Sequence, residues 1–142
     1  KREALFELII KNAVAYSISS ASVKEIETLN ILQATMLAMQ RAIDGLAVRT
    51  DLVLIDGNRL PPNLSNPARS IVKGDTLSAC IGAASILAKV SRDRLMYEMD
   101  KKYPCYQFSK HKGYGTALHI QLLHKYGCSP VHRTSFLNKI MG

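Results

Sequence analysis

Leu52-Val53-Leu54-Ile55-Asp56-Gly57 is a run of four apolar residues that ends in an acidic residue and a glycine. Between two helical patterns, a continuous apolar run of this kind is typical of a strand buried in a parallel sheet. Asp56 is then expected at the carboxyl end of the strand, where open α/β sheets bind their ligands. The Asp-Gly pair can equally be no more than the turn that follows the strand.

The sequence on both sides of this strand alternates between helical and extended patterns. Apolar residues have helical spacing at residues 2–11, 26–43, about 75–102 and 116–126. Shorter runs are expected to form strands at residues 14–18 and 69–72. The alternation predicts an α/β sheet with helices packed on it. We expect a single domain over residues 1–142, with a helical C-terminal part from about residue 103.

Local signals indicate where some of these helices begin. Ser22 and Glu25 have the spacing of a capping box, so a helix is expected to start just after Ser22. The long central helix is expected to be capped by Asp75 or Thr76. The first helix begins with the chain itself and has no capping residue, as if its first turns were missing.

Composition and charge narrow the class of protein. Apolar residues make up 47% of the chain, enough for a sizeable core. No apolar run reaches the roughly 18 residues of a membrane span, and no signal peptide is recognisable. The net charge of +8 favours a polyanionic partner such as nucleic acid or acidic lipid, although many basic proteins bind neither. Three widely spaced cysteines make neither a disulfide framework nor a zinc site, so a cytoplasmic location is expected.

Asp93 is a second acidic residue that could take part in chemistry. It lies in the middle of the long helix, where Lys89, one turn earlier, is a ready partner for an exposed ion pair. Alternatively, this helix packs beside the strand that ends at Asp56 and brings both carboxylates to one cleft. Two carboxylates that meet in this way attract a hard divalent cation. The spacing leaves both interpretations open.

A basic segment that contains glycines precedes the last helix. Residues 110–116 read Lys-His-Lys-Gly-Tyr-Gly-Thr. Backbone amides at a helix start attract phosphate, and Lys112 adds charge there. Tyr114 is poorly placed for core packing and could face a sugar or a base, whereas His111 is a surface residue if the segment is only a loop. Further along the chain, Arg133 either binds phosphate or pairs with a carboxylate.

Several motifs, in order along nearly the whole chain, together resemble the ribonuclease HII family. They are Leu54-Ile55-Asp56-Gly57-Asn58, Val72-Lys73-Gly74-Asp75, Ala83-Ala84-Ser85-Ile86-Leu87-Ala88-Lys89-Val90-Ser91-Arg92-Asp93, His111-Lys112-Gly113-Tyr114-Gly115-Thr116 and His132-Arg133-Thr134-Ser135-Phe136. The Ala-Ser-Ile-Leu-Ala-Lys-Val run that leads to Arg-Asp is the specific part, because a lone Asp-Gly occurs in many turns.

The resemblance implies an RNase H-like fold, which is a mixed sheet flanked by helices, and a site of four carboxylates in the order Asp-Glu-Asp-Asp. Asp56 matches the third carboxylate and Asp93 the fourth, so both are expected to be catalytic ligands of Mg²⁺ or Mn²⁺. Tyr114 matches a tyrosine that family members place against the sugar at an RNA–DNA junction. Asp75 matches a motif position for which we infer no definite role.

The remaining site residues follow from the same resemblance. Lys112, His111, Arg133 and Ser85 are expected to bind or support the substrate. The implied substrate is an RNA–DNA hybrid, or duplex DNA with embedded ribonucleotides. The implied reaction is two-metal hydrolysis on the 5′ side of a ribonucleotide, which leaves a 5′-phosphate and a 3′-hydroxyl. An intact member of the family is expected to be a monomer.

The sequence departs from the family at its beginning. Family members start with a strand that ends in Asp-Glu-x-Gly-Arg-Gly, and no such motif occurs among these 142 residues. The first two strands are therefore apparently missing, together with two of the four carboxylates. We expect these residues alone to bind metal weakly and to cleave poorly or not at all. The alternative function is that of a non-catalytic remnant that binds nucleic acid through its basic surface and Tyr114.

Overall fold

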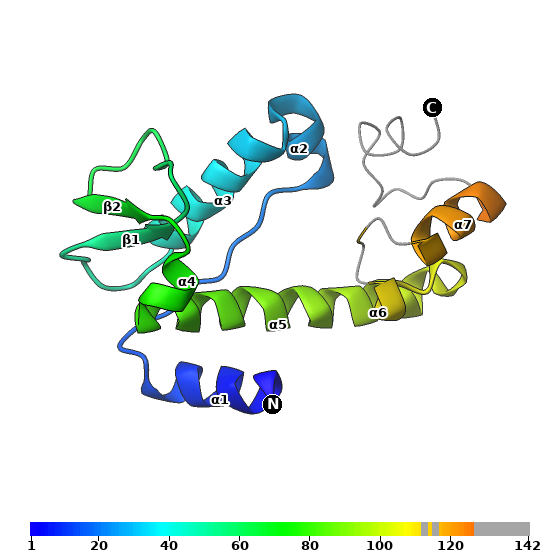
Figure 1. Cartoon of the computed structure of the whole chain (residues 1–142), viewed down its shortest axis with the longest axis horizontal. Helices are drawn as coiled ribbons and strands as arrows, with labels where there is room; N and C mark the ends of the chain where they lie inside the picture. The colour runs from blue at the N-terminus through cyan, green and yellow to red at the C-terminus, as the bar shows by residue number, and fades with distance from the viewer. Residues whose placement is uncertain (112–113, 115–116, 127–142) are drawn as a thin grey trace.

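The fold is built along one long helix, as the computed structural model shows (Figure 1). The structure describes residues 1–111, 114 and 117–126. Helix α5 (Ala79–Lys102) has 24 residues and is therefore about 36 Å long. The other elements are α1 (Arg2–Asn12), α2 (Val23–Leu29), α3 (Ile31–Asp44), β1 (Val53–Asp56), β2 (Ala68–Ile71), α4 (Gly74–Leu77), a 3₁₀ turn (Pro104–Tyr106), α6 (Phe108–His111) and α7 (Ala117–Tyr126). This order confirms the predicted α/β class.

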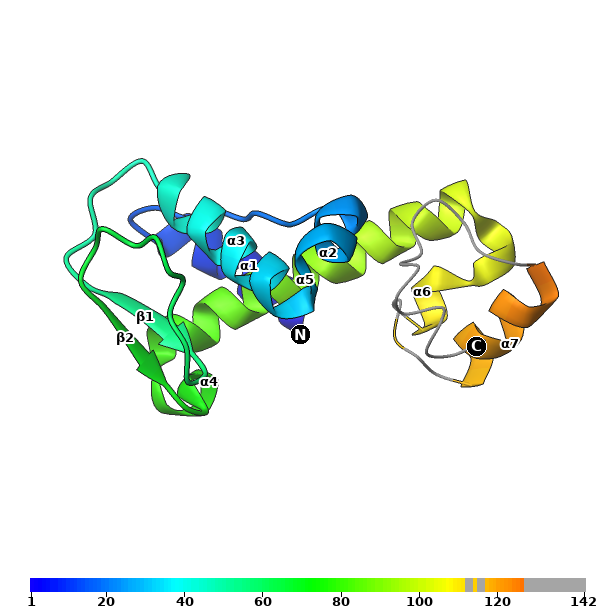
Figure 2. The ribbon, with the colours of Figure 1, turned by 90° about the horizontal axis from the view of Figure 1, so that it is seen from above.

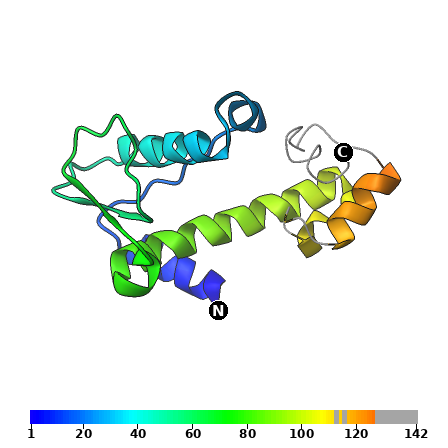
Figure 3. The ribbon, with the colours of Figure 1, turned by 45° about the horizontal axis from the view of Figure 1, so that its top comes forward.

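Two small apolar cores lie along α5. Near its middle, Phe6 of α1 packs against Leu87 and Val90. At its C-terminal end, Met96 packs in a second core with residues of the 3₁₀ turn, α6 and α7, namely Tyr106, Phe108 and Leu122. Figures 1 to 3 show the two strands at one end of α5, and α6 and α7 at the other end.

The sheet of the described residues consists of β1 and β2, which are parallel. Val53 is opposite Ala68 and Asp56 is opposite Ile71. Val53 and Ile55 are buried and Leu54 is half-buried, while Asp56 at the end of the strand is exposed. The parallel strand predicted from this run is confirmed. The implied mixed sheet is not observed within the described range, where both strands run in the same direction.

The predicted strand at residues 14–18 is wrong, because the chain between α1 and α2 forms no strand. Val14 is 92% exposed and packs in no core. The alternation of apolar and small residues correctly indicates an extended chain. It cannot indicate whether another strand is available for pairing, and a strand needs such a partner for its backbone groups.

Two predicted helix boundaries are also corrected. The helix predicted over 26–43 is two helices, because Asn30 adopts φ 76° and caps α3 by accepting a hydrogen bond from the Gln33 amide (3.0 Å). The long helix is capped by Ser78 and not by Asp75 or Thr76, which lie in the separate short helix α4. The predicted capping box at Ser22 is confirmed.

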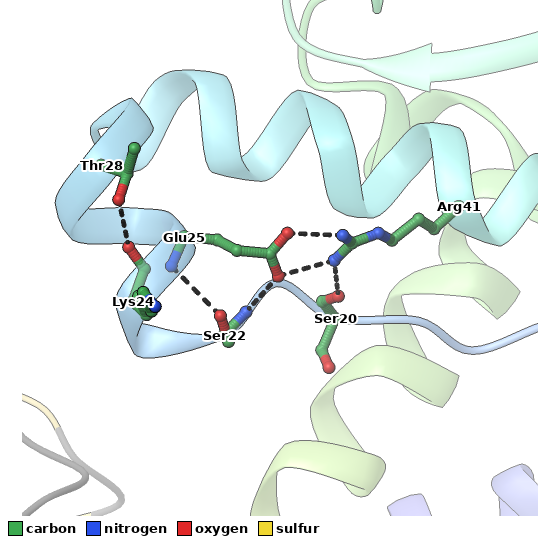
Figure 4. A network of polar contacts seen from close by, with 6 residues as sticks. All are labelled: Ser20, Ser22, Lys24, Glu25, Thr28 and Arg41. Carbon is green, nitrogen blue, oxygen red and sulfur yellow. Dashed lines mark hydrogen bonds and ion pairs between the residues drawn. The ribbon is translucent and has the colours of Figure 1, made fainter.

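Figure 4 shows how the capping box is connected to α3. The Glu25 carboxylate accepts hydrogen bonds from the Ser22 amide and from the Arg41 guanidinium. Arg41 also donates to the Ser20 carbonyl (3.0 Å). The Arg41 and Ser22 hydrogen bonds lower the pKa of Glu25 to about 2. One arginine therefore holds both the start of α2 and the extended segment before it.

Candidate active site

Asp56 is positioned by the turn that follows β2. Lys73 adopts the left-handed conformation (φ 55°) and turns the chain into α4. The Gly74 amide then donates a hydrogen bond to Oδ1 of Asp56 (2.9 Å). A methyl group at Gly74 would come within 2.6 Å of Ile81 Cδ1. Glycine therefore suits this position, because any side chain here would require the end of Ile81 to shift.

A cavity of about 660 Å³ opens beside Asp56. Its wall includes the extended residues Ser17–Ser20, which the Arg41 network holds in place, and one face of α3. The opposite wall is a face of α5 that carries Ser85, Ala88 and Arg92. The wall is largely apolar. Among the residues that line it, Asp56 and Arg92 are charged. The predicted site residue Ser85 thus lies in the same cavity as Asp56.

Asp93 does not line this cavity. Around α5 it is rotated by about 140° from Ala88, which lines the cavity, and by only about 60° from Val90. Val90 is buried against Phe6 of α1, so Asp93 lies nearer the α1 side of the helix. The sequence also allowed an ion pair between Asp93 and Lys89. No such pair occurs among the ion pairs of the described residues.

Asp75 directly follows Gly74, the residue whose amide holds the Asp56 carboxylate. It is exposed in α4. The hydrogen bond between Gly74 and Asp56 therefore brings the backbone of Asp75 next to the end of β1. The separate helix α4 causes this placement, and the sequence pattern did not predict it.

Tyr114 is exposed and is connected to the cavity wall through Arg92. The residue is 61% exposed, so its ring is accessible. The guanidinium carbon of Arg92 lies 5.6 Å from the centre of the Tyr114 ring, which is a cation–π distance. Sequence reasoning missed Arg92, although its spacing of seven residues from Ser85 places both on one face of α5.

His111 is buried and is not a surface residue. It is 4% exposed and bonds the Tyr106 carbonyl through Nε2 (2.6 Å). Burial is the main cause that lowers its pKa; the nearby His119 also lowers it, while the hydrogen bond to Tyr106 and the charge of Asp100 raise it. This buried position supports a structural role for His111, beneath Tyr114, and not a direct contact with the substrate. Lys112 and Arg133 lie outside the described residues.

The donor set at Asp56 suits a hard divalent cation. Within the described part of the chain only Oδ1 of Asp56 has a hydrogen bond, which leaves Oδ2 for a ligand. Mg²⁺ is commonly held by one or two carboxylates together with waters and substrate phosphates. The described residues contain no group of three or more His, Cys, Asp or Glu side chains that could hold a metal ion. Asp56 would supply one carboxylate ligand to such a metal.

The fold and the site together define an RNase H-like α/β protein with a carboxylate at the end of a parallel strand. The sequence profile of ribonuclease HII matches residues 1–139, and the chain belongs to the ribonuclease HII family of type II ribonuclease H enzymes.

Similar proteins named ribonuclease HII occur in several bacteria. The protein of Neisseria meningitidis serogroup C / serotype 2a is 54% identical over 136 residues, which are 96% of this chain and 70% of the relative. The protein of Caldicellulosiruptor bescii is 53% identical over 141 residues, which are 99% of this chain and 68% of the relative. That of Desulfitobacterium hafniense is 57% identical over 136 residues and is matched over 52% of its length. None of the helices in the described residues is long and apolar enough to cross a membrane.

Proposed function

We propose that the protein is an endonuclease that hydrolyses the phosphodiester on the 5′ side of a ribonucleotide. The substrate is an RNA–DNA hybrid, or duplex DNA with an embedded ribonucleotide. The observation that carries this proposal is the position of Asp56, which the Gly74 amide holds at the open end of a parallel strand beside a cavity. The names of the relatives support the reaction class.

The reaction uses Mg²⁺ or Mn²⁺, with Asp56 as a ligand. A metal held there would supply Lewis-acid chemistry for activation of the attacking water and for stabilisation of the charge on the phosphate and on the leaving 3′ oxygen. Family resemblance makes Asp93 the second of the two metal-binding carboxylates in this chain, but its position towards α1 gives that assignment little support. Asp75 is the better candidate, because the contact between Gly74 and Asp56 brings its backbone to the same strand end.

Residues on the other side of the cavity bind the substrate. Arg92 is exposed at the wall and supplies a positive charge for a backbone phosphate. Tyr114 presents its ring next to Arg92 and packs against the sugar of the ribonucleotide. Ser85 adds a hydroxyl group to the wall of the same cavity. Lys112 and Arg133 supply further phosphate contacts.

A nicking assay tests these roles. The chain is joined to the Asp-Glu-x-Gly-Arg-Gly segment of a relative and given Mn²⁺ and a duplex with one ribonucleotide. We expect Asp56→Asn to abolish nicking, a loss of at least about a hundredfold, and to leave duplex binding nearly intact. Asp75→Asn and Asp93→Asn then identify the second carboxylate. We expect the large loss for Asp75→Asn and a change of less than about threefold for Asp93→Asn. Full nicking by Asp56→Asn contradicts the proposal.

The 142 residues alone are proposed to bind metal weakly and to nick poorly. Their described part offers no group of three metal-ligating side chains, and the charge of +8 would still attract nucleic acid. The alternative function, a non-catalytic nucleic-acid-binding protein, rests on the same two facts. The two functions differ in the joined chain: nicking beside the ribonucleotide supports the enzyme, whereas salt-sensitive binding without nicking supports the binding protein.

A further inference from the structure

Two buried histidines lie stacked beneath Tyr114. The rings of His111 in α6 and His119 in α7 are parallel within 6°, with their centres 4.0 Å apart. They are 4% and 2% exposed. The ring of Phe108 meets both of them edge-on, with its centre 5.2 Å and 6.0 Å from theirs. Through Phe108 the pair adjoins the second apolar core.

Each histidine hydrogen-bonds a backbone carbonyl five residues before it. Nε2 of His111 bonds the Tyr106 carbonyl (2.6 Å), and Nδ1 of His119 bonds the Tyr114 carbonyl (2.8 Å). A carbonyl oxygen can only accept, so the proton must lie on Nε2 in His111 and on Nδ1 in His119. In their neutral forms the two rings therefore have opposite tautomers, which is a specific and measurable requirement.

The same pair holds the backbone of Tyr114 on both sides. The Tyr114 amide donates to the His111 carbonyl (3.0 Å), and the Tyr114 carbonyl accepts from the His119 ring. A phenylalanine would fill the space of His119 but would leave this carbonyl without the donor. A hydrogen-bonding ring beside the apolar core thus fixes one backbone position for an exposed tyrosine.

We propose that His119, supported by the stacked ring of His111, is a positioning residue for Tyr114 in nicking beside a ribonucleotide. This inference rests on the proposed function, in which the Tyr114 ring packs against the sugar. His119 touches no substrate and acts only through the Tyr114 backbone. Burial is the main cause that lowers the pKa of His111, which disfavours a charged ring in this stack.

Substitutions that keep or remove a single donor test the positioning role. Asparagine can place its amide near Nδ1 of histidine, and glutamine near Nε2. We therefore expect His119→Asn to nick within about threefold of the parent, and His119→Gln and His119→Leu to lose about tenfold in kcat/KM. For His111 the order is reversed: His111→Gln is tolerated and His111→Asn is impaired. Equal activity of the four polar variants overturns the proposal.

A double-mutant cycle separates positioning from general stability. If His119 acts through Tyr114, His119→Leu should lose about tenfold in the parent and almost nothing further when Tyr114→Ala is already present. A loss of the same size in both backgrounds shows that His119 supports the fold in general and overturns the proposal.

Proton-coupled ¹⁵N spectra of the imidazole rings give a readout that does not depend on activity. We expect the Nδ1–H tautomer for His119 and the Nε2–H tautomer for His111, with exposed His124 as the reference ring in α7. Reversed tautomers overturn the proposal even when the enzyme is active. If the joined chain fails to nick while these tautomers are found, the proposed function fails and the hydrogen bond to Tyr114 stands.

Discussion

Gly74 lies between the Asp56 carboxylate and helix α5 in the candidate site. Its amide holds Oδ1 of Asp56, and its lack of a side chain lets Ile81 of α5 approach. The sequence motif Val72-Lys73-Gly74-Asp75 pointed to this region without showing what it does. The structure supplies the reason: the turn after β2 must pass between a carboxylate and a helix.

We expect Gly74→Ala to destabilise the protein by about 1–3 kcal/mol, because the added methyl group would meet Ile81 Cδ1 at 2.6 Å. It should also reduce nicking by displacing the amide that holds Asp56. Urea denaturation and the nicking assay measure the two effects. Shortening the opposing side chain with Ile81→Val should recover part of the loss in the double variant, while Ile81→Val alone costs about 0.5–1.5 kcal/mol. A Gly74→Ala protein as stable as the parent would show that the contact relaxes freely.

Single residues show how far sequence reasoning reaches at the site. Asp56 could be found from the sequence, because a buried strand run identifies its own end. The positions of Asp75 and Asp93 could not, because they depend on where α5 begins and on which face of it meets the cavity. The break at Ser78 separates Asp75 from the long helix, and the packing of Phe6 sets the α1 side of that helix. Neither fact is local in sequence.

Among the elements, those with strong local signals agree with the sequence. The capping box at Ser22, helix α1 and the strand β1 were all predicted within one or two residues. The errors arise where tertiary contacts decide. Asn30 interrupts a continuous apolar stripe, and its side chain caps the second half of the split helix. Such a break was hidden because the stripe keeps its helical spacing across it.

The ion pair between α2 and α3 should make the stability of this helix pair depend on acid pH. The pKa of Glu25 falls from 4.5 to about 2 in the folded protein. A carboxyl group with a lowered folded pKa stabilises the fold at pH above 4.5, and this contribution is lost as the pH falls through about 2. We therefore expect Glu25→Gln to lower the melting temperature at pH 7 and to flatten its decline between pH 4.5 and pH 2.

Glu98→Gln is the matched control for this experiment, because Glu98 pairs with Lys101 on the exposed surface of α5. High salt should shrink the effect of Glu25→Gln, since the Arg41 and Glu25 side chains are 42% and 30% exposed. If the melting temperatures of the Glu25→Gln variant and of the parent declined in the same way at acid pH, the pair would contribute nothing to the pH dependence of stability.

Across the whole molecule, the described residues leave much apolar surface uncovered. Val14, Val72 and Leu77 are 92%, 63% and 73% exposed, and the described sheet has only two strands. A two-stranded sheet has an unpaired edge on each side, which is a template for association. The relatives named above are longer than the region they share with this chain, which covers 70% of the Neisseria protein. Residues outside the shared region are natural candidates to cover this surface.

We therefore expect a polypeptide of these 142 residues alone to bind a hydrophobic dye, to associate, and to melt over a broad range. Joined to the Asp-Glu-x-Gly-Arg-Gly segment of a relative, the same residues should melt cooperatively as a monomer, because a strand added at the free sheet edge pairs its backbone groups and buries apolar side chains. Dye fluorescence, circular dichroism melting and light scattering compare the two chains. A scrambled segment of the same composition is the control, since it adds length without an ordered strand. A sharp two-state melt of the 142 residues as a monomer would mean that this surface is stable without a cover.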